Sequence, residues 1–137
     1  MLALGYFARE PIPSQRSATL NPQEVRVKAT TVPYESLART PATFQGQIVT
    51  FRGKVIQVTQ SGANYVMRVN VNRGKYDTWT DTIYVNYQAA SQAEPRILQG
   101  DIIQLWGEFV GIKSYTAVLG QTIQIPQVVA RAVEATR

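Results

Sequence analysis

Apolar and polar residues alternate through a series of short segments between positions 47 and 135. A period of two is typical of β-strands that bury one side and expose the other. The segment from 65 to 71 is the clearest example, because its odd-numbered positions are all apolar: Tyr65, Met67, Val69 and Val71. Glycine-containing clusters separate the segments and predict turns. The second part of the chain is therefore expected to be all-β.

The alternation predicts three strands in a meander, a connector, and then two further strands. The expected bounds are Ile48 to Thr59, Tyr65 to Val71 and Thr78 to Tyr87 for the meander, a loop from Gln88 to Gln99, and a fourth strand that begins at Gly100-Asp101. A turn is expected from Gly111 to Ser114. The last strand is expected to begin near Tyr115, with breaks at Gly120 and Pro126.

The sequence before position 47 has a different character. The polar, proline-containing segment from 9 to 21 predicts an extended linker. The segment from 24 to 31 alternates and predicts an added edge strand, either within the barrel or with another chain. PYESLAR, from 33 to 39, predicts a short helix that Thr40-Pro41 ends. The expected organisation is an N-terminal extension over 1–32 and a folded domain over 33–137.

This order of elements favours a five-stranded Greek-key barrel of the OB-fold type, with a short helix ahead of it. Gly53 interrupts the long first strand, where a bulge or tight bend would let that strand serve both sheets. Another small barrel or a sandwich is the alternative architecture.

Composition excludes several kinds of catalysis. The 137 residues include no histidine and no cysteine, so zinc-thiolate sites, Ser-His-Asp triads and Cys-His pairs are all absent. The carboxylates Asp77, Asp81, Asp101 and Glu108 have no identifiable partner for acid–base work. We therefore expect no catalytic residues, no metal and no cofactor, and we expect a binding module rather than an enzyme.

Positive charge is concentrated in the predicted meander. The chain carries a net charge of +5, of which +3 falls between positions 47 and 88. OB barrels bind ligands on the face of their second and third strands and at adjoining loops. The outward residues expected at that face, at the turn beyond it or in the loop between the last two strands are Arg52, Lys54, Arg68, Asn70, Arg73, Lys75, Tyr84, Lys113 and Tyr115.

Cations beside an aromatic ring suit single-stranded nucleic acid, because cations track phosphates and rings stack on bases. The same residues also suit an ordinary solvated sheet face, where outward positions are polar in any case. Trp106 is expected to pack beneath the connector or the N-terminal helix. Trp79 either stacks on a ligand or caps the barrel, and the sequence does not choose between these roles.

The segments YESLARTPATFQGQIVTFRGKVIQV, NYVMRVNV, DTIYVNY, RILQGDIIQLWGEFVG and SYTAVLGQTIQIPQVVARAVE resemble bacterial OB-fold domains. Such domains occur in lipoproteins and in membrane-anchored or secreted proteins described as nucleic-acid-binding. The resemblance spans Tyr34 to Glu134. It implies an extracytoplasmic location, periplasmic or at the cell envelope, with a membrane tether upstream of residue 1. The sequence departs from a lipoprotein in having no lipobox cysteine.

Three functions stay open at this point. The first is a module that binds single-stranded nucleic acid or another anionic ligand through the basic face. The second is an extracytoplasmic protein-interaction module. The third, binding of a carbohydrate or a small anion, would use the same face. Residues 1–8 (MLALGYFA) fit the remnant of a signal or anchor, a first strand or a disordered start.

Overall fold

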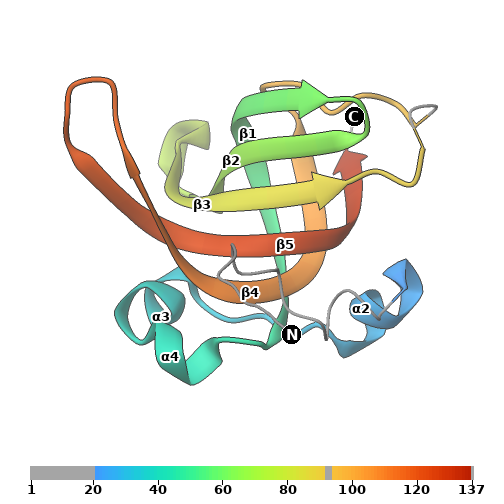
Figure 1. Ribbon diagram of the computed structural model, residues 1–137, viewed down its shortest axis with the longest axis horizontal. Helices are drawn as coiled ribbons and strands as arrows, with labels where there is room; N and C mark the ends of the chain where they lie inside the picture. The colour runs from blue at the N-terminus through green and yellow to red at the C-terminus, as the bar shows by residue number, and fades with distance from the viewer. Residues whose placement is uncertain (1–20, 92–93, 137) are drawn as a thin grey trace, which may run out of the picture.

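A computed structural model describes residues 21–91 and 94–136 (Figure 1). Five strands close into a barrel in the order β1-β2-β3-β5-β4. Their bounds are β1 (Ile48–Ser61), β2 (Asn64–Arg73), β3 (Trp79–Gln88), β4 (Ile102–Thr116) and β5 (Thr122–Thr136). Short helices precede and interrupt them: α2 (Pro22–Lys28), α3 (Tyr34–Arg39), α4 (Pro41–Phe44) and the 3-10 turn η1 (Lys75–Asp77).

Closure of the barrel depends on the length of β1. Its first half pairs with β4 and its second half with β2, so that Lys54 pairs with both Ile102 and Asn70. All pairings are antiparallel except the one between β3 and β5. A five-stranded Greek-key barrel with this strand order is an OB fold, which confirms the fold class predicted from the sequence.

Gly53 permits a close approach between strands. A Cβ atom there would lie 2.5 Å from the Asn70 carbonyl oxygen and 2.7 Å from Cγ1 of Val69. No side chain fits at that distance, so glycine lets β1 cross closely over β2. The irregularity in pairing lies further along, between Val55 and Gln57. The expected bulge at Gly53 is therefore displaced by a few residues.

The inward faces of the strands form one core. The residues that the alternation placed inward, among them Met67, Val69, Ile83 and Val85, are fully buried. Glu108 departs from this alternation, which predicts an outward position for it, because it is only 1% exposed. The strand pairing shifts between Trp106 and Gly107, immediately before it, so simple alternation does not hold at that point.

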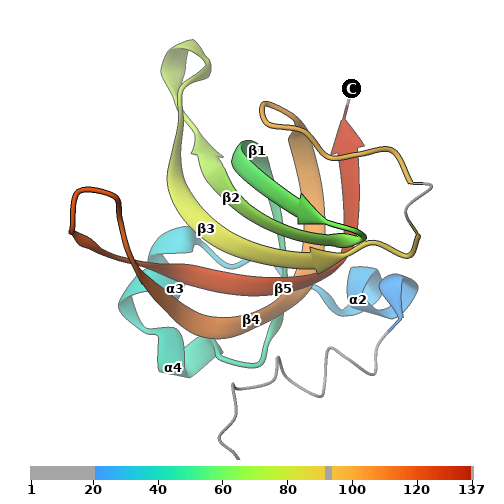
Figure 2. The same ribbon diagram turned by 45° about the horizontal axis from the view of Figure 1, so that its top comes forward.

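The strands β4 and β5 form a much longer hairpin than the sequence predicted. Gly111 to Ser114 is not a turn, because Ile112 pairs with Pro126 and Tyr115 pairs with Ile123. Gly111 has φ +121° at a register shift, so the chain bends there and continues as a strand. The connection between β4 and β5 spans 117–121. Both the β2–β3 and the β4–β5 hairpins project from the same side of the barrel (Figure 2).

The edge strand predicted over 24–31 is wrong, because a helix begins in its place. The Asn21 side chain accepts a hydrogen bond from the Glu24 amide at 2.8 Å, and the Glu24 carboxylate accepts one from the Asn21 amide at 2.9 Å. This capping box, with Pro22 at the first helical position, outweighs the β-propensity of the valines. Only Thr30 forms a bridge to the barrel, with Val49. The expected segment 1–8, and the linker up to residue 20, lie outside the described residues.

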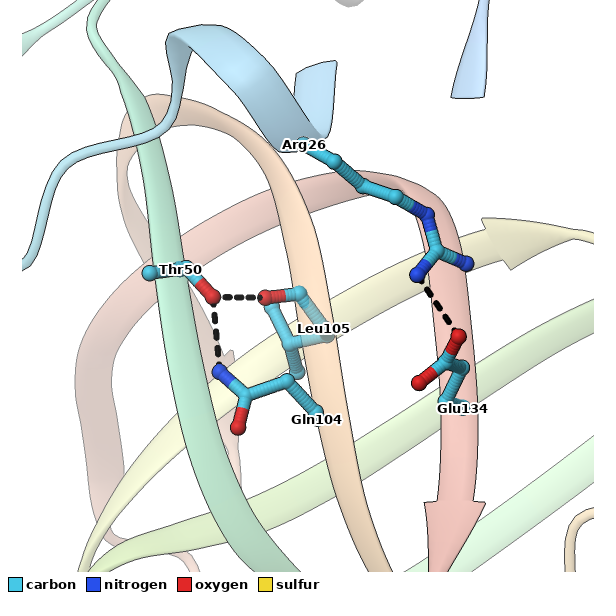
Figure 3. Close-up of polar contacts among 5 residues, drawn as sticks. All are labelled: Arg26, Thr50, Gln104, Leu105 and Glu134. Atoms are coloured by element: carbon cyan, nitrogen blue, oxygen red, sulfur yellow. Dashed lines mark hydrogen bonds and ion pairs between the residues drawn. The ribbon is translucent and has the colours of Figure 1, made fainter. Parts of the chain in front are cut away.

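Helix α2 is docked on the outside of β1, β4 and β5. Val25 is completely buried against Ile48 and Ala132. The Arg26 guanidinium lies 4.2 Å from the centre of the Trp106 ring. Trp106 is therefore a packing residue beneath an N-terminal helix. Arg26 also forms an ion pair with Glu134 of β5 at 2.7 Å (Figure 3). Side-chain bonds also join β1 to β4, because the Thr50 hydroxyl accepts a hydrogen bond from the Gln104 amide and donates one to the Leu105 carbonyl.

The helix predicted over 33–39 forms as α3. Its Leu37 is fully buried in the main core cluster, together with Phe51 and Phe109. The residues that follow form the short helix α4, which the sequence analysis did not expect. In the described part of the chain, no helix is long and apolar enough to cross a bilayer.

Candidate functional site

Four of the nine predicted site residues meet at one place on the outer surface. Arg68 of β2 donates a hydrogen bond from Nη1 to the Tyr115 hydroxyl at 2.8 Å. The ring centres of Tyr84 and Tyr115 lie 6.3 Å apart, and the Lys113 Nζ lies 5.2 Å from the centre of the Tyr84 ring. We call these residues, Arg68, Tyr84, Lys113 and Tyr115, the outer-face cluster.

Strand pairing explains why this cluster forms. Arg68 and Tyr84 are directly opposite each other in the antiparallel pair β2–β3, on its outward side. Tyr84 also pairs with Gln127 of β5, which in turn pairs with Gly111 of β4. Because β4 bends at Gly111, its outer half carries Lys113 and Tyr115 to this face. Both are strand residues, whereas the sequence placed them in a loop.

The electrostatics of the cluster favour an anionic ligand. It contributes two cations, and the outer part of the β4–β5 hairpin, between Glu108 and Glu134, contains no acidic residue. The Nε of Arg68 is buried and has no hydrogen-bond partner. Ligand contacts of this guanidinium would therefore come from the Nη donors that the bond to Tyr115 does not use.

Asn70 is committed to the sheet. Its side-chain oxygen accepts from the Thr82 hydroxyl at 2.6 Å, and its amide donates to the Trp79 carbonyl at 2.9 Å. The structure thus gives the predicted binding residue Asn70 a role in holding β2 to the start of β3. Lys54 lies where β1 passes from β4 to β2, and Lys75 begins the turn η1. None of the contacts that join the cluster involves these three residues.

Arg52 and Arg73 lie around a separate pocket. Arg73 follows Val71 on the inward side of β2, beyond the closed part of the barrel, and it pairs with Trp79. The pocket has a volume of about 370 Å³, and we call it the hairpin pocket; its lining residues are Arg52, Val71, Arg73, Asp77, Trp79 and Ile102. The predicted basic face is therefore divided between two places.

Two features of this region were not predicted from the sequence. The first is the position of Trp79, whose ring lies in the wall of the hairpin pocket, with a buried Nε1 that has no hydrogen-bond partner. The second is the tip of the β4–β5 hairpin, where Val118 and Leu119 are almost completely exposed. The signal for the tip is Leu119-Gly120 before a new alternating run, whereas the predicted turn begins at Gly111.

Within the described residues, no group of three or more acidic side chains is placed to hold a metal ion. The group with the largest change of pKa is Tyr87, which is not part of the outer-face cluster. Burial, with the nearby Glu94 carboxylate, raises the pKa of Tyr87 to about 12. Burial and the charge of Asp81 raise the pKa of Tyr34.

No family model and no curated protein matches this chain. Solved structures of similar fold include a putative aspartyl-tRNA synthetase from Leishmania major Friedlin, with a TM-score of 0.54 and 11% identity over 78% of this chain. An aspartyl-tRNA synthetase from Entamoeba histolytica has a TM-score of 0.53 and 16% sequence identity over 78% of this chain. A small single-stranded DNA-binding protein from Streptomyces coelicolor has a TM-score of 0.47 and 17% sequence identity, and the match covers 67% of this chain and 95% of that protein. The chain spans only 20% and 21% of the two synthetases, and at these identities the likeness shows a shared fold.

Proposed function

We propose that this domain is a non-catalytic module that binds single-stranded nucleic acid through the outer-face cluster. The observation that carries the proposal is a group of two tyrosines and two cations in mutual contact on the β2–β3 face, at the root of the β4–β5 hairpin. This is the face on which OB barrels bind oligonucleotides and oligosaccharides. Arg68 and Lys113 would contact phosphates, and the tyrosines would stack on bases.

The contacts within the free cluster are weak enough to yield to a ligand. Lys113 lies over the Tyr84 ring, and a cation–π contact at a solvent-accessible site is worth about 0.5–1 kcal/mol. A base stacked on an aromatic side chain is worth about 1–3 kcal/mol. Stacking on Tyr84 can therefore displace the ammonium, which is then available for a phosphate.

The arrangement favours single strands over duplexes. The cluster has only two cations, whereas duplex binding without sequence readout depends on many phosphate contacts. Its tyrosines need exposed base faces, which a single strand offers and a stacked duplex hides. A polar but unstacked oligosaccharide would make little use of the cations.

Several carboxylates are engaged in ion pairs or hydrogen bonds within the fold, which supports a binding module rather than an enzyme. Asp77 is paired with Arg73 at 3.0 Å, and Asp81 bonds the Asn72 amide. Asp101 accepts from the Leu98 amide at 2.9 Å, in a turn before β4. None of these contacts is a carboxylate pair of the kind used in acid–base catalysis.

The test is fluorescence anisotropy of a labelled single-stranded oligonucleotide at about 50 and about 200 mM salt. We expect binding that weakens with salt and that weakens further in Arg68→Gln. Arg39→Gln is the matched control, because Arg39 is an exposed α3 cation paired with Glu35. No binding at the lower salt concentration, or equal losses in both variants, would show that the cluster is an ordinary solvated surface.

A second candidate function is protein docking through the hairpin tip, and the exposure of Val118 and Leu119 favours it. The extracytoplasmic location implied by the sequence resemblance belongs to this alternative. Cell fractionation with photo-crosslinking from position 118 tests both parts. A specific adduct in the envelope fraction that is lost in Leu119→Ser would support docking, whereas oligonucleotide affinity should be unchanged in that variant.

A further inference from the structure

We propose that the hairpin pocket is a second binding site, for a nucleoside monophosphate whose base lies against Trp79 and whose phosphate lies between Arg52 and Arg73. The pocket volume of about 370 Å³ falls at the small end of the range for small-molecule sites. It lies on the inward side of the β2–β3 hairpin, whereas the outer-face cluster lies on the outward side. The inference therefore does not depend on the proposed function.

The indole of Trp79 points to a ligand that brings a hydrogen-bond acceptor. Its Nε1 is buried and has no partner, and a buried donor without a partner is costly. The residue itself is held firmly, because its carbonyl accepts from Asn70 and its backbone pairs with Arg73. Because Nε1 is buried, an acceptor atom of a base or a phosphate oxygen reaches it only after the indole side chain rotates toward the pocket.

The two guanidinium groups are available for an anion. Arg52 makes one hydrogen bond, to the Thr136 hydroxyl at 3.3 Å, which leaves most of its donors for other partners. Arg73 pairs with Asp77 at 3.0 Å, and the side chains of both are about two-thirds exposed. Exposed ion pairs contribute little stability, so a phosphate can take this guanidinium from the carboxylate.

The apolar walls argue against a bare inorganic anion. Val71, Trp79 and Ile102 line the same space as the two arginines. A phosphate alone would leave these walls without a partner, whereas a planar base would cover them and stack on the indole. A ligand that matches both the apolar lining and the two arginines is thus a base joined to a phosphate. It could be supplied by a free nucleotide or by the phosphorylated end of a strand.

Asp77 is the acidic residue in the lining of this pocket. It follows Tyr76, and both have φ +58°, a left-handed conformation that aspartate tolerates but tyrosine rarely adopts. This turn holds a carboxylate against Arg73, where it repels an incoming phosphate. Asp77 would therefore lower the affinity of the pocket, and its removal should raise the affinity.

The experiment follows the indole N–H signals of the ¹⁵N-labelled chain during titration with AMP. The chain has two tryptophans, and Trp79→Phe assigns their signals. We expect the Trp79 signal to shift saturably with AMP and to move much less with adenosine or inorganic phosphate. The Trp106 signal should not move. An oligonucleotide with a 5′-phosphate, compared with its unphosphorylated form, distinguishes a strand end from a free nucleotide.

Variants provide effects of opposite sign. Arg52→Gln should weaken AMP binding about tenfold or more, in line with the loss of a charge-assisted hydrogen bond, whereas Lys54→Gln, on the same strand but outside the pocket lining, should not. Asp77→Asn should tighten binding severalfold, because asparagine tolerates this φ and carries no charge. A Trp79 signal that does not respond to AMP, or that responds equally to phosphate alone, would overturn the proposal.

The two proposals fail separately. Arg68→Gln should reduce oligonucleotide affinity and leave the AMP titration of the hairpin pocket unchanged. Asp77→Asn should strengthen AMP binding in the same preparation. A loss of AMP binding in Arg68→Gln would contradict the assignment of the nucleotide to the hairpin pocket.

Discussion

The guanidinium of Arg68 and the hydroxyl of Tyr115 are joined by a 2.8 Å hydrogen bond between residues 47 positions apart. This bond ties the outer half of β4 to the middle of β2. It brings the two tyrosine rings of the outer-face cluster to a centre-to-centre distance of 6.3 Å. The β4–β5 hairpin is thereby part of the proposed nucleic-acid surface and not merely its border.

Tyr115 should contribute its ring to binding more than its hydroxyl. Tyr115→Ala should weaken binding of a single-stranded oligonucleotide by about 1–3 kcal/mol, because a stacking surface is lost. Tyr115→Phe keeps the ring and releases Arg68, so its loss should be much smaller. Anisotropy titrations of the two variants at one salt concentration make the comparison. Equal losses would show that the hydrogen bond, and not the ring, is what binding requires.

Arg68 should contribute a phosphate contact that is visible in the salt dependence. For single strands, each neutralised phosphate adds about 0.7 to the slope of log affinity against log salt. Arg68→Gln should reduce the slope by about this amount, and Arg39→Gln should leave it unchanged. The slopes come from anisotropy titrations at several salt concentrations. An unaltered slope in Arg68→Gln would place this guanidinium outside the interface.

Gly111 should be required for the bend in β4. Its φ of +121° is unfavourable for any residue with a Cβ. Gly111→Ala should lower the free energy of unfolding by about 1 kcal/mol or more, measured by urea denaturation. Gly74→Ala is the control, because a Cβ there would meet only the Thr78 carbonyl oxygen, at 3.6 Å. Similar effects of the two substitutions would contradict the role of the bend.

Val25 should anchor α2 to the barrel. Val25→Ala should cost about 2 kcal/mol, because this side chain is completely buried. Val27 is 80% exposed on the same helix, so Val27→Ala should have little effect. Urea denaturation measures both. If the segment were an edge strand as its alternation suggested, Val25 and Val27 would share one face and the two variants would behave alike.

Tyr87 should make stability fall at alkaline pH. Its pKa is about 12 in the folded state, raised by burial and by Glu94 from an ordinary value of 10.0. The unfolded chain therefore loses this proton first, so the stabilisation is complete below pH 10 and is lost as the pH rises toward about 12. Urea midpoints measured from pH 9 upward should decline less steeply in Tyr87→Phe, because this variant has no phenol to ionise at this position. Parallel curves would contradict the shift.

The sequence alone determined the barrel and most of its core. Alternation at Tyr65, Met67 and Val69 reflects a purely local property, the period of a strand, and burial follows once one face is apolar. The same holds for α3, whose proline start and buried Leu37 are local signals. Arg68 and Tyr84 could be placed on one face because adjacent strands of a meander pair directly.

Only the tertiary structure decided which of the candidate residues meet. Gly111 is a turn residue by sequence, and pairing of its neighbours with β5 converts it into a bend within a strand. That pairing carries Lys113 and Tyr115 to Tyr84. In the same way, β1 and β4 bring Arg52 and Ile102 to the pocket that Trp79 lines. These outcomes depend on contacts between distant segments, and a local pattern of residues does not contain that information.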